Sequence, residues 1–508
     1  MAGAATLARV DFTSAAGSSP QTRTRTGHFD VGVPDFVYLP VQVPSGVRQL
    51  DVTYSYDRPP TPPGVLGNAM DIGIFDERGH QLGAGAGFRG WSGGSRDGFS
   101  ISNPEATPGY LPGPIRPGTW HVVLGPYTVA PAGLNWTVQV TLTFAEPGPA
   151  FVPDYPPPRA RGRGRAWYRG DCHLHTVHSD GRRSPAEAAA GARVRKLDFI
   201  VSTEHNTSAS HGVWGQLAGD DLLIVTGEEI TTRNGHFVAA GLPPGTWIDW
   251  RYRARDGELP RFLRDIHRGG AIAVAAHPFS PCLGCAWKFG YAGMDAVEVW
   301  NGPWTLDDEV AVQLWNGMLV EAGRGGPWLP AMGNSDAHTE QHVIGLPHNV
   351  VLADDLIRGD VLDGLRAGRT WIAESADVDL AFTVTAGEGA AGGTTADEGA
   401  AGEGTAEGGR SAGIGERLRV APNVAVTAIL QVSGVPNGTV LFISDEGQTM
   451  GRALPAGGAG TVRWRTTPAA SAYVRAEVRH PSSDPSGLIP GAMAALTNPI
   501  FLGPPSTA

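Results

Sequence analysis

The stretch DCHLHTVHSDG at residues 171–181 carries three histidines and two aspartates within one short segment. In an extended chain, residues two apart point to the same side, so His173 and His175 can bind one ion together. A single histidine in a strand is more often a packing or surface residue. The interpretation of this stretch therefore depends on whether similar motifs recur along the chain.

Similar motifs do recur, each at the end of a predicted strand where the chain turns toward a helix. They are DFIVSTEHN at 198–206, TGEEIT at 226–231, GH at 235–236, AHP at 276–278 and SDAH at 335–338. Ser184-Pro185-x-Glu187 is a capping box that predicts a helix up to Lys196. Strands alternating with helices indicate an α/β fold with a parallel sheet, and a region of roughly 210 residues favours a closed barrel, in which strand ends converge on one face.

The side chains at these strand ends suit divalent metal ions. A catalytic ion binds imidazole nitrogen and carboxylate oxygen at about 2.0–2.2 Å and leaves one position open for water. Two ions about 3.5–4 Å apart need a bridging ligand, for which a carboxylate is best suited, and Glu229 is our candidate. With nitrogen and oxygen ligands alone, Zn, Mn and Fe are all chemically acceptable.

Together, these motifs resemble the polymerase and histidinol phosphatase (PHP) superfamily of metallohydrolases over residues 166–380. Three further segments, WYRGDCHLHT, GEEITTRNGHFVAAGL and TNPIFLG, are similar to its carbaryl-hydrolase-like branch, whose members also carry an N-terminal β domain. The resemblance implies a distorted (β/α)7 TIM-like barrel that holds two or three divalent ions.

The resemblance also implies which residues are metal ligands. It assigns them in three groups: His173, His175, Glu229 and Asp336 for one ion; Glu229, His236 and His277 for a second; and Asp180, His205 and His338 for a third ion that some members bind. Position 180 departs from the family pattern, because it is aspartate and not histidine. A third ion is therefore one alternative, and a role for Asp180 in orienting His175 or the water is the other.

The function expected from these motifs is that of a metal-dependent hydrolase with a metal-activated hydroxide, since bound ions lower the pKa of water toward 7. The expected catalytic residues are Asp336, His205 and Asp180, with Asp336 or His205 moving protons. The superfamily resemblance favours a phosphoester substrate, and the closer branch implies a carbamate or carboxylic ester. A non-catalytic binding protein is the third alternative. Arg233, as a clamp for an anionic group, and His342 are the candidate contacts to a small-molecule substrate.

Both flanks of the histidine-rich region predict β domains. Residues 1–150 alternate short β-type runs with Gly/Pro turns, which is typical of a β-sandwich, and residues 415–508 predict a second, smaller one. A Pro/Arg-rich linker at 151–165 and a low-complexity Gly/Ala/Glu linker at 386–414 separate them from the predicted barrel at 166–385.

Composition narrows the classes of function. Of 15 histidines, 11 lie between His173 and His348, which points to a central catalytic or metal-binding domain. The 50 acidic against 39 basic residues give a net charge of −11, which argues against charge-driven nucleic-acid binding. No apolar run is long enough to span a membrane and no secretory signal is seen, so we expect a cytoplasmic protein without a membrane partner. The oligomeric state stays open. Cys282 and Cys285 form a CxxC that we interpret as a loop clip or two free thiols.

Overall fold

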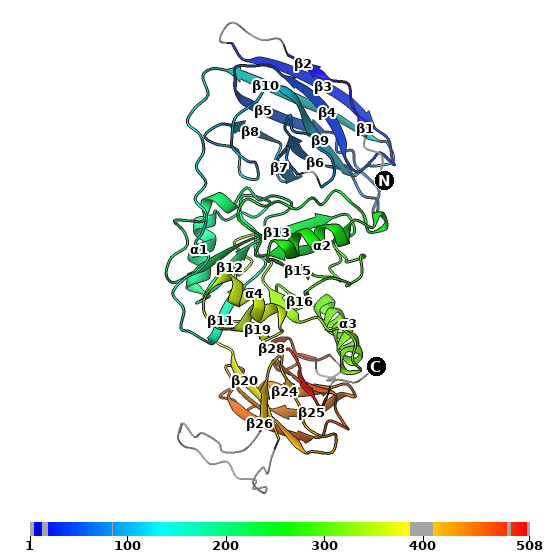
Figure 1. Ribbon diagram of the computed structural model, residues 1–508. Coiled ribbons are helices and arrows are strands. Elements are labelled where there is room, and N and C mark those ends of the chain that lie inside the picture. Colours follow the sequence, from blue (N-terminus) through cyan, green and yellow to red (C-terminus); the bar gives the residue numbers. More distant parts are fainter. Residues whose placement is uncertain (1–4, 13–18, 84, 387–409, 485–488, 505–508) are drawn as a thin grey trace.

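The computed structural model describes residues 5–12, 19–83, 85–386, 410–484 and 489–504. The chain forms three regions along one long axis (Figure 1): an N-terminal β region, a central region that contains all four α-helices of the described residues, and a C-terminal β region. Among these residues, no helix combines the length and the apolar character needed to cross a membrane.

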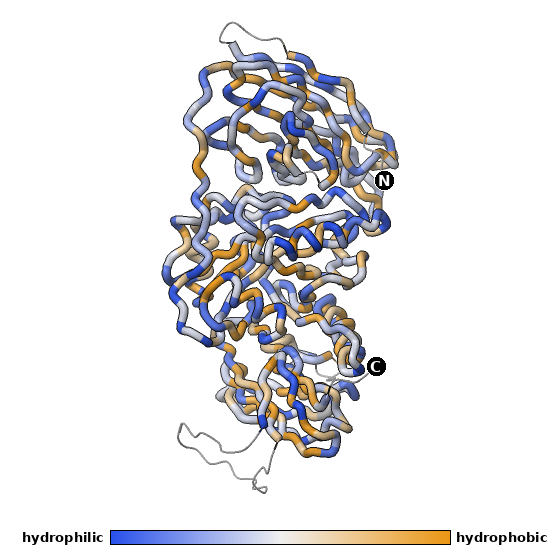
Figure 2. Tube along the Cα trace, viewed as in Figure 1, coloured by the Kyte–Doolittle hydropathy of each residue, from blue (hydrophilic) through white to orange (hydrophobic). Residues whose placement is uncertain are grey.

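The N-terminal region consists of two sheets around one apolar core. Its strands are β1 (Ala5–Thr6), β2 (Val10–Asp11), β3 (Gln21–Phe29), β4 (Val37–Val43), β5 (Val47–Tyr56), β6 (Ala69–Phe75), β7 (Phe88–Gly93), β8 (Gly98–Ser102), β9 (Gly118–Thr128) and β10 (Leu134–Phe144). One sheet has the order β1-β4-β9-β6-β7, with β2 also paired to β4, and the other has the order β3-β10-β5-β8. Hydrophobic and hydrophilic residues alternate along strands such as β10 (Figure 2), so one face of its sheet is buried, whereas β4 and β7 of the other sheet are buried on both faces.

The central region is built on a curled sheet. Its elements are β11 (Ala166–Asp171), α1 (Pro185–Val194), β12 (Phe199–Ser202), η1 (His211–Val213), β13 (Leu223–Thr232), β14 (Gly235–Ala240), η2 (Ala254–Asp256), α2 (Leu259–Arg268), β15 (Ile272–Ala275), β16 (Ala296–Asn301), α3 (Leu306–Gly323), β17 (Ala331–Asn334), β18 (His348–Ala353), α4 (Arg358–Arg366) and β19 (Thr370–Ala373). The strand order is β17-β16-β15-β14-β13-β12-β11-β18-β19. The sheet curls until β17 lies beside β18, where the Asn349 side chain bonds both the N–H and the carbonyl of Gly333.

This sheet is mixed, so the prediction of a parallel sheet holds only in part: β11-β12-β13 and β15-β16-β17 pair in parallel. β13 and β14 form an antiparallel hairpin, and β14 is also antiparallel to β15. β18 runs antiparallel to both β11 and β19. Only residues 233–234 connect β13 to β14, and a parallel crossover needs a dozen or more residues. A (β/α)7 barrel is therefore not confirmed.

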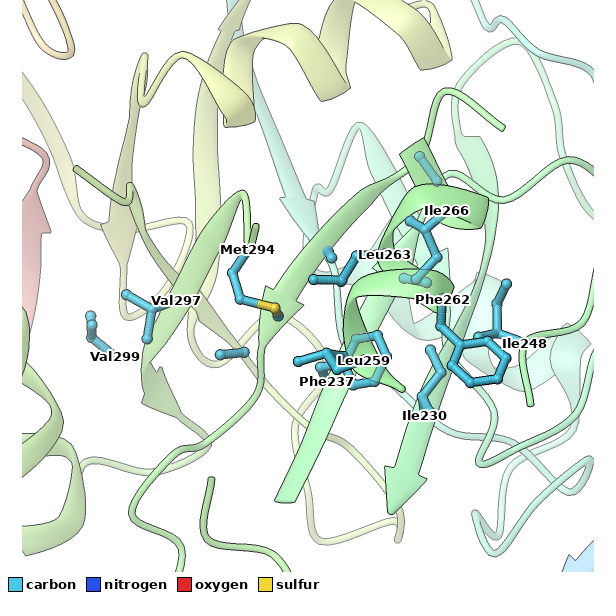
Figure 3. Packing of buried hydrophobic residues seen from close by; sticks show 14 of the residues in the cluster. Ile230, Phe237, Ile248, Leu259, Phe262, Leu263, Ile266, Met294, Val297 and Val299 are labelled. Atoms are coloured by element: carbon cyan, nitrogen blue, oxygen red, sulfur yellow. The ribbon is translucent and has the colours of Figure 1, made fainter. Parts of the chain in front are cut away.

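The helices follow the sequence signals more closely. Ser184 caps α1 as predicted: its Oγ accepts a hydrogen bond from the Glu187 N–H, and Glu187 accepts one from the Ser184 N–H. The helix ends at Val194, two residues before the predicted end. On α2, apolar residues three or four positions apart pack onto the sheet (Figure 3), and they are Leu259, Phe262, Leu263 and Ile266.

The C-terminal region continues the central sheet. Its strands are β20 (Asp379–Ala386), β21 (Arg410–Gly413), β22 (Arg417–Leu418), β23 (Val426–Ser433), β24 (Thr439–Ser444), β25 (Gly447–Ala453), β26 (Gly460–Thr466), β27 (Tyr473–Arg479), β28 (Met493–Thr497) and β29 (Ile500–Leu502). β28 pairs with β19 and extends the sheet through β27, β24 and β25, while β21-β20-β23-β26 form a second sheet. β20 and β21 pair with each other across the predicted linker at 386–414. Residues 387–409 of that linker lie outside the described residues.

Candidate metal centre

The strand ends of the central sheet bring histidines and carboxylates to one edge. They are His173 and His175 after β11, His205 after β12, Glu229 in β13, His236 in β14, His277 after β15, and Asp336 and His338 after β17. His236 stands near the beginning of its strand, unlike the others. It reaches the same edge because β14 is antiparallel to β13, which places His236 opposite Thr231. The structure therefore brings together all the side chains that the motifs singled out as ligands.

Four donor atoms of the cluster, two histidine nitrogens and two carboxylate oxygens, face one another at distances that suit ligands of one metal ion. His173 Nε2 lies 3.3 Å from Glu229 Oε2 and 3.4 Å from Asp336 Oδ1. His175 Nε2 lies 3.4 Å and 3.1 Å from the same two oxygens. Ligands placed tetrahedrally about 2.0–2.1 Å from an ion are about 3.3–3.4 Å apart. These four buried atoms form no hydrogen bond of normal geometry within the described part of the chain, so the residues fit a divalent ion.

The other oxygen of Glu229 faces a second pair of histidines. Glu229 Oε1 lies 3.0 Å from His236 Nδ1 and 3.1 Å from His277 Nε2. His173, Glu229 and His277 also form one of the groups that could hold an ion. A carboxylate with one oxygen toward each of two ligand groups has the arrangement of a bridging ligand.

A third group contains Asp180, His205 and His338 together with His175. Asp180 Oδ1 is 3.5 Å from His205 Nε2 and 3.3 Å from His338 Nε2. The two histidine nitrogens are 3.4 Å apart. Asp180 therefore faces His205 and His338 as a further potential ligand set, although the sequence resemblance had left its role open.

The backbone is strained where it presents two of these side chains. His277 has φ +24° and Asp336 has φ +47°, in the region that non-glycine residues rarely adopt. Asn206, next to His205, has φ +54°. Such strain persists only where surrounding contacts hold it, and it is concentrated at functional sites.

Glu298 supports this cluster and was missed by the sequence reasoning. Its Oε1 lies 3.2 Å from His173 Nδ1 and accepts a hydrogen bond from Asn334, and its Oε2 accepts from the His277 N–H and from Asn301. The signal was present in AVEVWNG at 296–302, where one acidic residue interrupts an apolar strand.

Two other buried carboxylates stabilise the loops that carry ligands. Asp171 accepts hydrogen bonds from Ser335 and from the Gly345 N–H, which ties β11 to the loop after β17. Glu204 accepts from Thr176 and Ser179, which hold the loop after β11. Cys172 packs in the apolar cluster behind β11.

Within the cluster, the pKa values of Asp336 and His175 are both lowered, which keeps Asp336 anionic and His175 neutral. Burial opposes the ionisation of Asp336, but His173, His175 and His338 together hold its pKa well below the usual value. Burial, assisted by His338 and His205, lowers the pKa of His175 to about 3. Anionic carboxylates and a neutral imidazole are the forms that bind metal.

The cluster opens into a cavity of about 590 Å³ that the N-terminal and central regions share. Aromatic side chains of Phe36, Trp91, Tyr127 and Trp250 form part of the wall. Cys282 and Cys285, which also line the cavity, form a disulfide, in agreement with the loop clip proposed from the sequence.

The two candidate substrate residues differ in position. Arg233 lines the cavity, but its guanidinium donates to the carbonyls of Tyr127 and Pro126 and lies 3.4 Å from Asp35 Oδ1. His342 accepts a hydrogen bond from the His338 N–H and is not among the lining residues of the described chain. Neither side chain is thus presented freely to a ligand.

The chain shows only weak similarity to known proteins. No family model and no curated protein matches the chain. A two-domain protein from Bacteroides vulgatus assigned a PHP-like metal-dependent phosphoesterase shares 16% identity over 69% of this chain and 100% of its own, with a TM-score of 0.35. A protein from Bifidobacterium adolescentis assigned as a metal-dependent phosphoesterase shares 17% over 41% of this chain and 96% of its own, with a TM-score of 0.27.

An amidohydrolase from Chromobacterium violaceum shares 19% identity over 35% of this chain and 89% of its own, with a TM-score of 0.25. These TM-scores are too low to assign the chain to a family. What the site can do is therefore inferred from its own residues.

Proposed function

We propose that this chain is a metal-dependent hydrolase that cleaves an ester bond, with a phosphoester as the first candidate substrate. The observation that carries the proposal is the set of four buried donor atoms of His173, His175, Glu229 and Asp336, in which each histidine nitrogen lies 3.1–3.4 Å from both carboxylate oxygens beside a cavity. Divalent ions bound there supply Lewis acidity and lower the pKa of water toward neutrality.

The chain's own residues have separable tasks in this proposal. His173, His175, Glu229 and Asp336 hold the first ion, and Glu229 with His236 and His277 holds the second. His205 and His338 lie at the cavity side of the cluster with Asp180, where they can accept and pass on a proton from water. Aromatic side chains line another part of the cavity wall.

A carbamate or carboxylic ester is the second candidate substrate, and one observation favours it. Arg233 is the only lysine or arginine among the described lining residues, and it is already engaged by Asp35 and by two carbonyls. A phosphate group would therefore find no free side-chain cation. The aromatic wall suits a substrate with a large apolar part.

Metal analysis and a substrate panel test the proposal. The purified protein is assayed for bound Zn, Mn and Fe and for turnover of a phosphomonoester, a phosphodiester, an aryl carbamate and a carboxylic ester. We expect at least one ion per chain and turnover of one class, both lost in His173→Ala and His175→Ala. His28→Ala is the matched control, because His28 is an exposed histidine in β3 of the N-terminal region. Less than one ion per chain with no turnover would reject the hydrolase and leave a binding protein.

A further inference from the structure

The N-terminal region supplies one wall of the cavity above the metal centre. β6 and β7 lie at the side of that region that faces the central sheet (Figure 1). They and the loop after β7 contribute Ala69, Asp71, Trp91 and residues 92–95 to the lining. The contact between the regions is both apolar and polar: the Trp91 and Trp250 rings lie 4.7 Å apart, Phe88 stacks on Trp247 at 4.1 Å, and Arg253 pairs with Asp35. An interface of this kind holds the wall in a fixed place.

Asp71 is the one carboxylate on that wall. It is partly exposed to the cavity and forms no hydrogen bond or ion pair with any residue that the structure describes. Gly125 lies close beneath its side chain, where an added Cβ would lie 3.2 Å from Asp71 Cβ, while a Cβ at Gly94 or Gly93 would make an ordinary contact with Asp71 Oδ1 at 3.4 Å or 3.9 Å. The carboxyl group, which is costly to leave unpaired, stands without a hydrogen-bond partner at the cavity wall.

The other proton-bearing groups of the lining are engaged inside the protein. Five of its hydroxyls have partners: Tyr127 donates to the Leu283 carbonyl, Ser95 to that of Ser92, Ser179 to Glu204, Ser92 pairs with Tyr110, and Thr231 pairs with His205. The sixth, Ser280, lies against Cys282. The histidines and remaining carboxylates belong to the metal cluster. Among the described lining residues, Asp71 alone is both ionisable and uncommitted.

From this placement we propose that Asp71 is the general acid that protonates the leaving group of the substrate. The proposal rests on the hydrolase function proposed above and adds a catalytic residue from outside the central region. A scissile centre held at the cluster extends its leaving group into the cavity, where the wall bearing Asp71 faces it.

The same bond changes and proton transfers describe hydrolysis of either substrate class. Water adds to the carbonyl carbon or phosphorus, and its proton passes to solvent through the cluster side. The bond to the leaving oxygen breaks with its electron pair on that oxygen, which takes the carboxyl proton of Asp71. An acid and an alcohol or phenol are released, and the Asp71 carboxylate regains a proton from solvent. Burial raises the pKa of Asp71 to about 7, opposed by Arg233 and His205, so the protonated form is available near neutral pH.

The test compares leaving groups in the full-length, metal-loaded protein. The probes are the 4-nitrophenyl and unsubstituted phenyl esters of the acyl or phosphoryl group that the substrate panel identifies. A 4-nitrophenolate needs little help to depart, whereas phenolate needs a proton. We expect Asp71→Asn to lose roughly 100-fold or more in kcat on the phenyl ester and less than about tenfold on the 4-nitrophenyl ester, in the range of general acid catalysis. Asp51→Asn is the matched control, a partly exposed carboxylate on β5 that lies outside the cavity.

Two further measurements separate a catalytic role from a structural one. Metal content should be unchanged in Asp71→Asn, since Asp71 is not in any of the potential ligand groups. In Asp71→Ala, added formate should restore part of the activity on the phenyl ester. An equal loss on both esters, or no loss on either, would overturn the role of Asp71 while the wild-type turnover still supports the hydrolase. Absence of wild-type turnover would instead reject the hydrolase itself.

Discussion

Replacing Glu298 by glutamine tests whether the metal centre depends on residues behind its ligands. Glu298 is buried and accepts at both oxygens: from His173 and Asn334 at Oε1, and from the His277 N–H and Asn301 at Oε2. A proton on His173 Nδ1 that points to Glu298 leaves Nε2 unprotonated toward Glu229 and Asp336. The carboxylate thereby selects the tautomer that can bind a metal.

The expected magnitude follows from these four contacts. Whichever way the new side-chain amide of Glu298→Gln is turned, its NH2 group faces two donors, so two hydrogen bonds to a charged acceptor are lost. Each is worth roughly 1.5–3 kcal/mol, which gives roughly 3–6 kcal/mol for the local network. Relaxation absorbs part of this, and loss of a group that orients a ligand typically weakens metal binding about 10–100-fold. We therefore expect Glu298→Gln to bind metal about 10–100-fold more weakly than the wild type.

The assay is a competition between the protein and a chromogenic chelator, with Zn and with Mn, after the protein has been stripped of metal by dialysis. Glu321→Gln is the control, because Glu321 lies on the exposed side of α3 and pairs only with Arg324. Thermal unfolding of the metal-free variants shows whether each is folded. A folded Glu298→Gln protein whose metal affinity stays within about twofold of the wild type would refute the proposed role of Glu298.

Three more outcomes can be measured. Chelation of the metal should lower the melting temperature in calorimetry, because an ion at about 1,000 times its Kd stabilises the folded state by about 4 kcal/mol, and an unchanged melting temperature would contradict a bound ion. Asp180→Ala should keep both proposed ions and lower turnover, because Asp180 lies between His205 and His338 on the proton-transfer side, and elemental analysis that finds one ion lost would instead indicate a third metal site. His211 is fully buried, with its pKa lowered by burial from 6.5 to about 4, so the folded state binds fewer protons than the unfolded state in that range and stability falls as the pH drops. The stability difference between wild type and His211→Gln in urea unfolding should therefore shrink by about 3 kcal/mol from pH 7 to pH 4, and a constant difference would exclude this linkage.

The candidate ligands could be found from sequence because their signals are local. His173 and His175 stand two apart after one strand, and Asp336 and His338 repeat the pattern after another. Alternating strands and helices then require that such strand ends meet, whatever the details of the sheet. The meeting of the ligand-bearing strand ends at one site was thus predictable, even though the direction of β14 was not.

The direction of β14 was predicted wrongly for a physical reason. An apolar run such as GHFVAAGL has the same composition in a parallel and in an antiparallel strand. Its direction depends on the length of the connection, and residues 233–234 are short enough only for a hairpin. The burial of His211 has a similar origin. It depends on a contact between distant segments, in which the Gly245 N–H donates to His211 Nδ1.

The cavity is the part of the site that no local signal could reveal. Asp71 lies about a hundred residues before the first ligand, and although it interrupts an apolar strand as Glu298 does, nothing in that strand shows what the side chain faces. Its importance comes only from the packing of β6 and β7 against the aromatic residues at 247 and 250 of the central region. If Asp71 does protonate the leaving group, the N-terminal region is part of the active site, and Asp71→Asn in the full-length chain should leave metal binding intact while hydrolysis of poor leaving groups is lost. A full-length Asp71→Asn protein that held metal and cleaved phenyl esters as the wild type does would show that the wall only covers the site.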